Sequence, residues 1–342
     1  MKYCNTEHYE IQRVNPDNLE KLAAQRFAWR AERMKSNRLV KLYQMAGYGP
    51  YADRVELCAT KLDFQTIGGK KVLQSANFCK LRLCPMCVAR GAIVRAKLLS
   101  RVMDAVQAEH DGCEYFFLTL TVKNVPGSEL GDAIGQLCSG WNKLMQHRAV
   151  KRAVKGWFRA IEITRNGDMY HPHIHAIVAV EHAYFLKKNG LWITHDEWVR
   201  RWQMALKVDY KPSVDVRKTT DQKGGKGAVL EAAKYVTKDS DYISDRLSDA
   251  KAAQIVTDYT RALYHRRLTA FGGWMKETAK RLQADDLDNV DLQQGDDETI
   301  RDDLVEMVET YYWHFGAGDY VLASRRVNPL RIKREGEGYA GK

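Results

Sequence analysis

The sequence predicts an α+β protein in which a central antiparallel β-sheet is flanked by helices, with a small metal-binding module and helical N- and C-terminal extensions. Three observations predict this fold class. Segments typical of helices and strands follow the order helix, strand, strand pair, helix, strand, helix, which indicates an antiparallel sheet. Asn166-Gly167-Asp168 marks a hairpin turn between two long strands. Four of the seven cysteines are spaced as in a metal site.

The first half of the chain supplies helices and one strong strand. Residues 1–48 indicate basic helices with a mixed apolar and cationic face. Residues 55–97 hold the cysteine cluster, and a helix is expected from about 88 to 110. The stretch "YFFLTLTV" at 115–122 is aromatic and β-branched, as strands are. Residues 129–154 have a helical pattern.

The hairpin and a second set of helices follow. The stretch "WFRAIEITRNGDMYHPHIHAIVAV", 157–180, predicts two antiparallel strands. Residues 195–208 predict an aromatic-rich helix, in which Trp198 and Trp202 are expected in the core. A short strand is expected at 213–218. The glycine-rich "DQKGGKG" then leads into a helix over "AVLEAAKYVTKDSDYI".

A chain of 342 residues is long enough for about two domains of roughly 150 residues each. The composition shifts predict four regions. These are a basic helical N-terminal region (1–54), a four-cysteine module with its following helix (55–110), a central α+β domain (111–282), and an acidic linker with a C-terminal extension (283–342).

The net charge is +11, and its distribution is uneven. Residues 283–310 contain eleven acidic residues and one arginine, a net charge of −10, which leaves +21 on the rest of the chain. A body that basic favours a phosphate backbone as partner. The acidic stretch is interpreted as a solvated linker or exposed helix face, or as a mimic that limits nonspecific DNA binding.

Membrane and secretory classes are not favoured. The hydrophobic content of 45% is ordinary for a globular protein, and no run of 18 apolar residues occurs. The first residues, "MKYCNTEHYEIQRVNP", lack the apolar region of a secretory signal. We therefore expect a cytoplasmic protein without a membrane partner.

Three histidines occupy alternate positions of the second hairpin strand: His171, His173 and His175. Alternation places them on one face, while apolar residues on both faces indicate a central, buried strand. Buried imidazoles on one face repel one another if charged and need acceptors if neutral. A bound cation resolves both problems, and neutral imidazole is a common metal ligand. The alternative is a set of ordinary core histidines.

Cys58, Cys79, Cys84 and Cys87 follow the spacing C-x20-C-x4-C-x2-C. This spacing is typical of a structural zinc site, because four thiolates form a closed tetrahedral shell. A redox C-x-x-C pair is the alternative. Several basic residues surround the cluster and suggest that it faces DNA: Arg82, Arg90, Arg95 and Lys97.

In the helix expected after residue 227, Glu231 and Tyr235 lie one turn apart, and Lys238 follows within the next turn. Taken alone, this is an ordinary helix surface. Beside a metal site it becomes chemically specific, because a tyrosine hydroxyl with a pKa of about 10 needs electrostatic help to act as a nucleophile. A divalent ion and a lysine at a phosphodiester would give that help.

The stretches "FLTLTV", "HPHIHAIV" and "EAAKYVTKDSDY" resemble the three ordered motifs of the HUH endonuclease superfamily. Within it, the chain is similar to the rolling-circle replication initiators of small bacterial plasmids that pair one catalytic tyrosine with a glutamate four residues earlier. The stretches "NFCKLRLCPMC" and "RRLTAFGGWMKE", with Cys58, extend the resemblance over about 55–280. It implies an HUH/RRM-like sheet.

The resemblance also implies roles for single residues. His173 and His175 would bind Mg²⁺ or Mn²⁺, and Tyr235 would nick the origin strand and become linked to its 5′ phosphate. Glu231 would activate water at termination, and Lys238 would neutralise the scissile phosphate. As third ligand we favour Glu162, a hard carboxylate on the partner strand, over His171, which shares the histidine face.

The implied partners are plasmid origin DNA, as a single-stranded or hairpin nick site with a duplex binding site, and host replication proteins. No G-x-x-x-x-G-K-[ST] motif occurs, so unwinding is assigned to a host helicase. The free 3′ hydroxyl would serve the host DNA polymerase, and host single-strand binding protein would cover the displaced strand. A relaxase, a single-tyrosine transposase and a noncatalytic zinc-containing DNA-binding regulator are the alternative functions.

Overall fold

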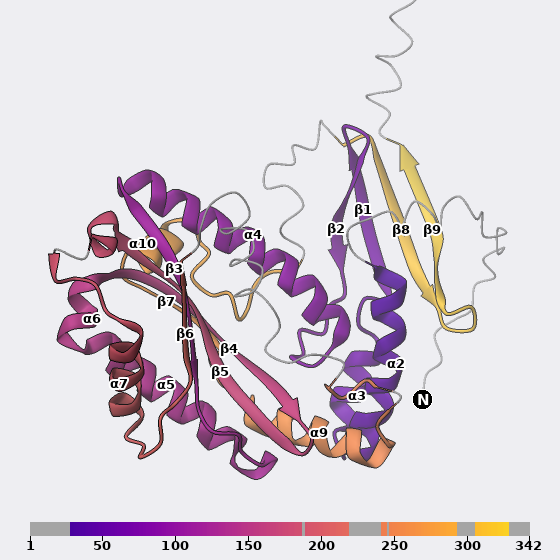
Figure 1. The fold of residues 1–342 in the computed structure, drawn as a ribbon. Coiled ribbons are helices and arrows are strands. Elements are labelled where there is room, and N and C mark those ends of the chain that lie inside the picture. The colour runs from indigo at the N-terminus through magenta and orange to yellow at the C-terminus, as the bar shows by residue number, and fades with distance from the viewer. Residues whose placement is uncertain (1–27, 187–188, 219–240, 245, 293–304, 328–342) are drawn as a thin grey trace, which may run out of the picture.

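Two antiparallel sheets organise the described part of the chain (Figure 1). The structure is a computed structural model that describes residues 28–186, 189–218, 241–244, 246–292 and 305–327. These residues contain eight α-helices, so the α+β class is confirmed. The elements are α2 (Trp29–Met45), α3 (Gly49–Glu56), β1 (Lys61–Ile67), β2 (Lys70–Ala76), α4 (Pro85–Glu109), β3 (Cys113–Thr121), α5 (Leu130–Gln146), α6 (Arg148–Ala153), β4 (Val154–Asn166), β5 (Met169–Glu181), α7 (His195–Leu206), β6 (Val214–Lys218), α9 (Asp249–Ala262), β7 (Thr269–Gly272), α10 (Gly273–Arg281), β8 (Met307–His314) and β9 (Asp319–Val327).

The central sheet has five strands in the order β6-β3-β5-β4-β7. Its middle strand, β5, is buried from Tyr170 to Val180 except at His171, which explains why apolar residues occupy both of its faces. The turn between β4 and β5 includes Gly167, whose φ of +61° is accessible to glycine. The predicted hairpin, the strands at β3 and β6 and the helix at α7 are confirmed.

Helices cover both faces of the central sheet. Phe116 of β3 packs against Trp198 of α7, with ring centroids 6.1 Å apart, on the face that α5 and α7 cover. The preceding residue, Tyr115, points to the opposite face, where its hydroxyl donates to the carbonyl of Met103 in α4 at 2.8 Å. Trp198 and Trp202 are fully buried, as predicted. The long helix α4 therefore lies on the face opposite α5 and α7.

The second sheet has the order β2-β1-β8-β9 and corrects one prediction. The C-terminal extension was expected to be helical, but within the described residues it forms the hairpin β8–β9. Buried and exposed side chains alternate along Glu309–His314, which is a strand period. Lys61 of β1 pairs with Tyr312 of β8, so segments far apart in the chain share one sheet. The division of the chain into four regions stays a prediction.

Several acidic side chains of the 283–310 stretch support the fold. Glu309 is 1% exposed and forms ion pairs with Lys71 and Arg325. Burial would raise the pKa of the Glu309 carboxyl, but the bonds to the two cations outweigh it and lower the pKa. The carboxylate of Asp288 accepts the backbone N–H groups of Leu268, just before β7, and of Thr269, the first residue of β7, at 2.9 and 3.2 Å. In its described parts, this stretch is therefore more than a solvated linker.

Some predictions concern residues that the structure does not describe. Of the helices expected in residues 1–48, α2 is confirmed, while 1–27 lie outside the described residues. Residues 219–240, including Glu231, Tyr235 and Lys238, also lie outside them. Among the helices of the described residues, none combines the length and apolar character that a bilayer crossing requires.

Two adjacent glycines allow the chain to turn from β7 directly into α10 against strand β4. Gly273 has a φ of +52°, and a Cβ added there would lie 2.0 Å from the carbonyl oxygen of Lys155. A Cβ at Gly272 would lie 2.2 Å from the ring of Trp157. This close approach explains why the stretch "FGGW" carries two glycines at the sheet edge.

We predict that Gly273→Ala destabilises the protein far more than Gly68→Ala. Both glycines have positive φ, +52° and +56°, so both variants carry the backbone cost of about 1–2 kcal/mol. Only at Gly273 does the added methyl meet backbone, whereas nothing lies within 4 Å of the Cβ at Gly68. Urea unfolding of the two variants measures the difference. Equal losses would show that the approach of α10 to β4 is not tight.

Candidate functional site

Three polar side chains meet in the interior of the central sheet. Nε2 of His173 and Nε2 of His175 lie 3.0 Å apart, and Oε2 of Glu162 lies 3.4 and 2.8 Å from them, respectively. Each residue is at most 9% exposed. A buried carboxylate and two buried imidazoles are costly unless they satisfy one another or hold an ion. These three residues are one of two groups in the described chain that could hold a metal.

Strand register brings the three groups together. Glu162 of β4 lies directly opposite His173 of β5, and His175 is two positions further along the same face. The long hairpin fixes this register, because a shift by one residue would turn the histidines to the other face. Phe117 of β3 stacks on the ring of His175, with centroids 5.3 Å apart. The sheet thus positions both side chains before any ion is bound.

Hydrogen bonds orient both rings with Nε2 toward the shared point. Nδ1 of His173 lies 3.0 Å from the carbonyl oxygen of His171, an acceptor that a proton on Nδ1 satisfies, and Nε2 points to the other two groups. Nδ1 of His175 is 3.2 Å from the hydroxyl of Thr119 on β3. Metal-binding histidines usually engage their other ring nitrogen in this way. The sequence did not indicate that Thr119 orients a histidine.

The donor spacing fits a hard divalent cation. An octahedral ion with metal–ligand distances of about 2.1 Å places neighbouring ligands about 3.0 Å apart. The three distances of 3.0, 2.8 and 3.4 Å match one triangular face of such an octahedron. Such a face leaves the remaining coordination positions to water or substrate. Two imidazole nitrogens and a carboxylate oxygen together form a donor set for a divalent cation.

The charges at the centre favour an ionised carboxylate. Burial would raise the pKa of the Glu162 carboxyl, but the hydrogen bonds and charges of His173 and His175 outweigh it and hold the pKa well below its usual value. His171 lies apart from the group. Its ring centroid is 5.3 Å from that of His173, and burial with the nearby His173 lowers its pKa. The structure thus places Glu162, and not His171, beside the other two donors, while His171 contributes its backbone carbonyl.

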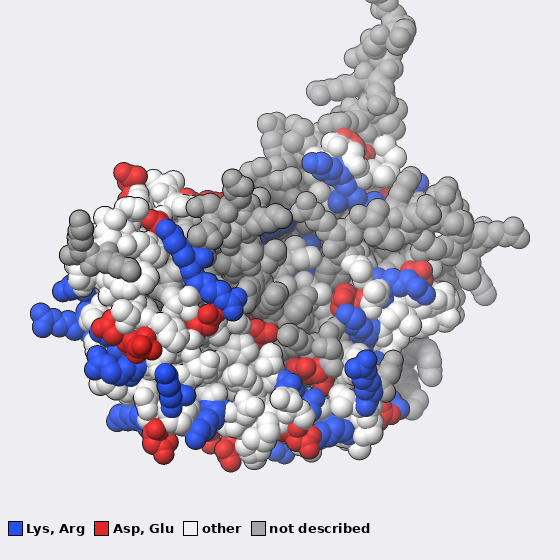
Figure 2. All heavy atoms as spheres, in the orientation of Figure 1, with Lys and Arg blue, Asp and Glu red and all other residues white. Residues whose placement is uncertain are grey.

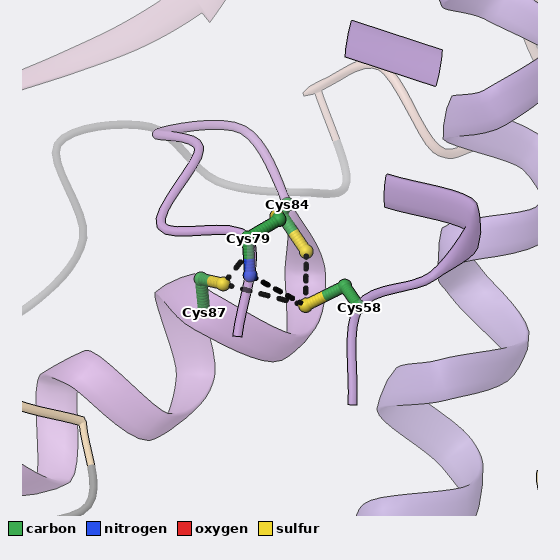
Figure 3. Close-up of side chains that lie close together, drawn as sticks. All are labelled: Cys58, Cys79, Cys84 and Cys87. Atoms are coloured by element: carbon green, nitrogen blue, oxygen red, sulfur yellow. Dashed lines mark hydrogen bonds between the residues drawn. The ribbon is translucent and has the colours of Figure 1, made fainter. Parts of the chain in front are cut away.

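The four predicted cysteines form the second group (Figure 3). Cys58 follows α3, Cys79 lies in the loop after β2, Cys84 caps α4, and Cys87 lies in its first turn. Sulfur–sulfur distances of 3.5, 3.5 and 3.6 Å join Cys58 to Cys87, Cys84 to Cys58 and Cys79 to Cys87. These distances are far too long for disulfide bonds.

The spacing of the four sulfurs fits a tetrahedral metal ion. With a Zn–S distance of about 2.3 Å, the four sulfurs lie about 3.8 Å apart, close to the spacing found. Backbone N–H groups of Cys79 and Lys80 donate to Cys58 Sγ and Cys87 Sγ at 3.4 and 3.2 Å. Lys80 reaches this position with a φ of +57°. The site is closed by four protein ligands, which suits a structural ion.

One basic residue near the cysteines does not face solvent. Arg90 is 3% exposed and donates to the carbonyl of Leu292 at 2.9 Å, so its expected role at a DNA-facing surface is wrong. On the face drawn in Figure 2, lysine and arginine are spread among aspartate and glutamate over the described surface. Charge alone therefore does not mark a DNA interface there.

The residues that directly follow 219–240 are firmly held. Tyr242 is fully buried, and its hydroxyl donates to the carbonyl of Leu83, next to Cys84, at 2.7 Å. The carboxylate of Asp241 accepts from the hydroxyl of Tyr259 at 2.9 Å, and its carbonyl accepts from Arg165 of β4 at 3.0 Å. This anchor, Asp241–Tyr242, ties the chain after Tyr235 to the cysteine loop and to the strand that carries Glu162. The sequence did not reveal it.

The fold and its two groups define a class of protein: an α+β protein with a buried two-histidine, one-carboxylate centre on its central sheet and a separate four-cysteine centre. The chain belongs to the replication protein family, whose model matches residues 70–321. The matched region contains both histidines, Glu162 and three of the four cysteines.

Curated relatives agree with this assignment. "Protein rep" of Streptococcus pneumoniae serotype 2 is 38% identical over 269 residues, which cover 77% of this chain and 82% of the relative. "Protein rep" of Bacillus amyloliquefaciens is 34% identical over 327 residues, covering 86% and 93%. "Replication protein" of Staphylococcus aureus is 32% identical over 221 residues, covering 62% and 93%. No solved structure matches the chain significantly.

We predict that Glu162→Gln weakens Mn²⁺ binding by more than about tenfold, since even loss of a hydrogen-bond partner of a metal ligand commonly has that effect. Isothermal titration measures the affinity. His171→Ala is the matched control, because it removes a ring outside the group and keeps the carbonyl that orients His173. If His171→Ala weakens binding as much as Glu162→Gln, the third ligand has been assigned to the wrong residue.

Proposed function

We propose that the protein initiates rolling-circle replication of a plasmid by nicking one strand at the origin through a 5′-phosphotyrosine linkage. The observation that carries this proposal is the triangular arrangement of Glu162, His173 and His175 on one face of the central sheet. Membership of the replication protein family and the order of the sequence motifs support it. Tyr235 follows the histidines in the chain and is the proposed nucleophile.

In the cleavage step, the phenolic oxygen of Tyr235 attacks the phosphorus of the scissile phosphodiester. The new bond joins tyrosine to the 5′ phosphate, and the bond from phosphorus to the 3′ oxygen breaks. The phenol loses its proton, and the leaving 3′ oxygen gains one to become a hydroxyl. A divalent ion held by Glu162, His173 and His175 would supply charge neutralisation and orientation at the phosphate. The free 3′ hydroxyl would prime the host DNA polymerase.

Two neighbours of Tyr235 complete the proposal. Lys238 would neutralise charge on the phosphate as it develops in the transition state. At termination, Glu231 would take a proton from a water molecule that attacks phosphorus in place of a second tyrosine. The carboxylate lies one helical turn from the phenol if this segment is helical, so both groups reach the same phosphate. The protein would then be released by hydrolysis.

The four-cysteine group is proposed to hold structural Zn²⁺, which would fix the loop at Leu83 that anchors Tyr242. The proposed partners are plasmid origin DNA, a host helicase, the host DNA polymerase and host single-strand binding protein. The positive charge outside 283–310 supports binding to the phosphate backbone.

We predict that the protein with Mn²⁺ cleaves single-stranded origin DNA and forms a covalent adduct, and that Tyr235→Phe forms none. Denaturing electrophoresis detects the adduct, and peptide mass spectrometry maps it to Tyr235. Tyr312→Phe, at an exposed tyrosine of β8, is the control and should cleave normally. Full cleavage by Tyr235→Phe would show that another residue is the nucleophile, whereas a wild-type protein that binds origin DNA but never cleaves it would be a DNA-binding regulator.

We predict one zinc ion per chain and its loss in Cys84→Ser, because a hydroxyl is a poor ligand in a thiolate shell. Inductively coupled plasma mass spectrometry of the purified variant measures the zinc content. Cys113→Ser, at a buried cysteine outside the group, is the matched control and should keep its zinc. A Cys84→Ser protein with undiminished zinc would contradict the assignment.

A further inference from the structure

A cavity of about 160 Å³ lies between the loop that joins Cys79 to Cys84, the helices α2 and α3, and the C-terminal end of α9. Four tyrosines and two cations contribute to its lining: Tyr43, Tyr51, Tyr259, Tyr264, Lys80 and Arg82. A volume of about 150 Å³ holds one benzene ring in an engineered protein cavity. The space is therefore matched to a single aromatic ring, the size of a nucleobase.

The walls combine ring faces with positive charge. Tyr264 is 63% exposed, so its ring is available to a ligand at the rim. Lys80 and Arg82 contribute cations, and none of the described residues that line the cavity is acidic. Burial raises the pKa of Tyr43, so its hydroxyl stays protonated and uncharged. Aromatic rings beside cations are the surface that binds single-stranded nucleic acid, because bases stack on the rings and phosphates pair with the cations.

Backbone strain is concentrated at the same rim. Lys80 and His265 have φ values of +57° and +50°, and they are two of the five described non-glycine residues with positive φ. Such conformations are unfavourable for non-glycine residues and cluster at ligand-binding positions. Lys80 is fixed by its N–H bond to Cys87 Sγ, and the tyrosine before His265 contacts its ring, with centroids 4.1 Å apart.

The cavity is linked to the metal-binding group by packed tyrosines. Tyr259, in the cavity wall, contacts Tyr170 of β5 with ring centroids 5.3 Å apart. Tyr170 directly precedes His171 on the strand of the histidines. Tyr259 also contacts Tyr242, the anchor after the Tyr235 segment, with centroids 6.2 Å apart. The cavity wall, the histidine strand and the anchor after Tyr235 therefore pack against one another.

We propose that this cavity is a subsite for one unstacked nucleobase of the single-stranded origin DNA, with Tyr264 as its stacking platform and Lys80 and Arg82 as phosphate contacts. A duplex keeps its bases stacked, so the site selects a strand that is single or extruded in a hairpin loop. The inference rests on the proposed function, because it takes origin DNA as the ligand, and it extends that function to how the strand is held away from the scissile phosphate.

The experiment is an abasic scan of the origin oligonucleotide, with affinity measured by fluorescence anisotropy without Mg²⁺ or Mn²⁺ at fixed salt. With the wild-type protein, removal of one particular base is expected to weaken binding about tenfold, as loss of a base–aromatic stack does. Tyr264→Ala weakens binding of the intact oligonucleotide by a similar factor and shows no further loss at that position. Tyr264→Phe, which keeps a ring, retains the wild-type profile.

Tyr312→Ala is the matched control, because it removes another exposed tyrosine from the second sheet. An abasic profile of Tyr264→Ala that equals that of the wild type, or an equal loss in Tyr312→Ala, would overturn the subsite. Because the assay uses no cleavage, the two proposals fail separately. Normal nicking with no effect of Tyr264→Ala overturns only the subsite, while cavity-dependent binding without nicking supports the subsite and overturns only the cleavage chemistry.

Discussion

The pairing of Glu162 with His173 across the β4–β5 hairpin is the constraint on which the rest of the structure depends. This register places the carboxylate of β4 and the two imidazoles of β5 within hydrogen-bond distance on one face of the sheet. Such a cluster is costly in a protein core unless its members satisfy one another or an ion. The flanking strand supports the arrangement, since Thr119 binds the far nitrogen of His175 and Phe117 stacks on its ring. The central sheet therefore holds Glu162, His173 and His175 together as one buried polar group.

The four-cysteine group does not touch the Glu162, His173 and His175 group, and the two are connected through helix α4 and the anchor Asp241–Tyr242. Cys84 caps helix α4, which lies on the sheet face that Tyr115 shares with the histidines. The carbonyl of Leu83, directly before Cys84, accepts a hydrogen bond from the hydroxyl of Tyr242. The carbonyl of Asp241 accepts one from Arg165 of β4. The chain on the C-terminal side of Tyr235 is thus held between the cysteine loop and the hairpin strand. A structural ion in the cysteine group would fix this anchor between the cysteines and strand β4.

The central sheet and the two side-chain groups, Glu162 with the histidines and the four cysteines, could be located from sequence because their signals are local. Each signal lies within a short stretch of sequence: the alternation along β3 and β5, the turn at Gly167 and the spacing of the cysteines. The distance of Glu162 from that turn predicted that it faces the histidines. The second sheet could not be predicted in this way. Its strands β1 and β8 pair across more than 240 residues, as Lys61 does with Tyr312, and no local pattern encodes such a partner. The same holds for Glu309, whose buried ion pairs depend on that sheet, and for the cavity at Tyr264, which three separate segments form.

The central claim is that Glu162, His173 and His175 hold a divalent cation on the sheet face used for cleavage. Crystals soaked in Mn²⁺, with diffraction recorded at the manganese absorption edge, test it most directly. The account predicts an anomalous peak within about 2.3 Å of Nε2 of both histidines and of a Glu162 oxygen. A map with no peak between these atoms at saturating Mn²⁺, or with manganese bound only elsewhere, would contradict it.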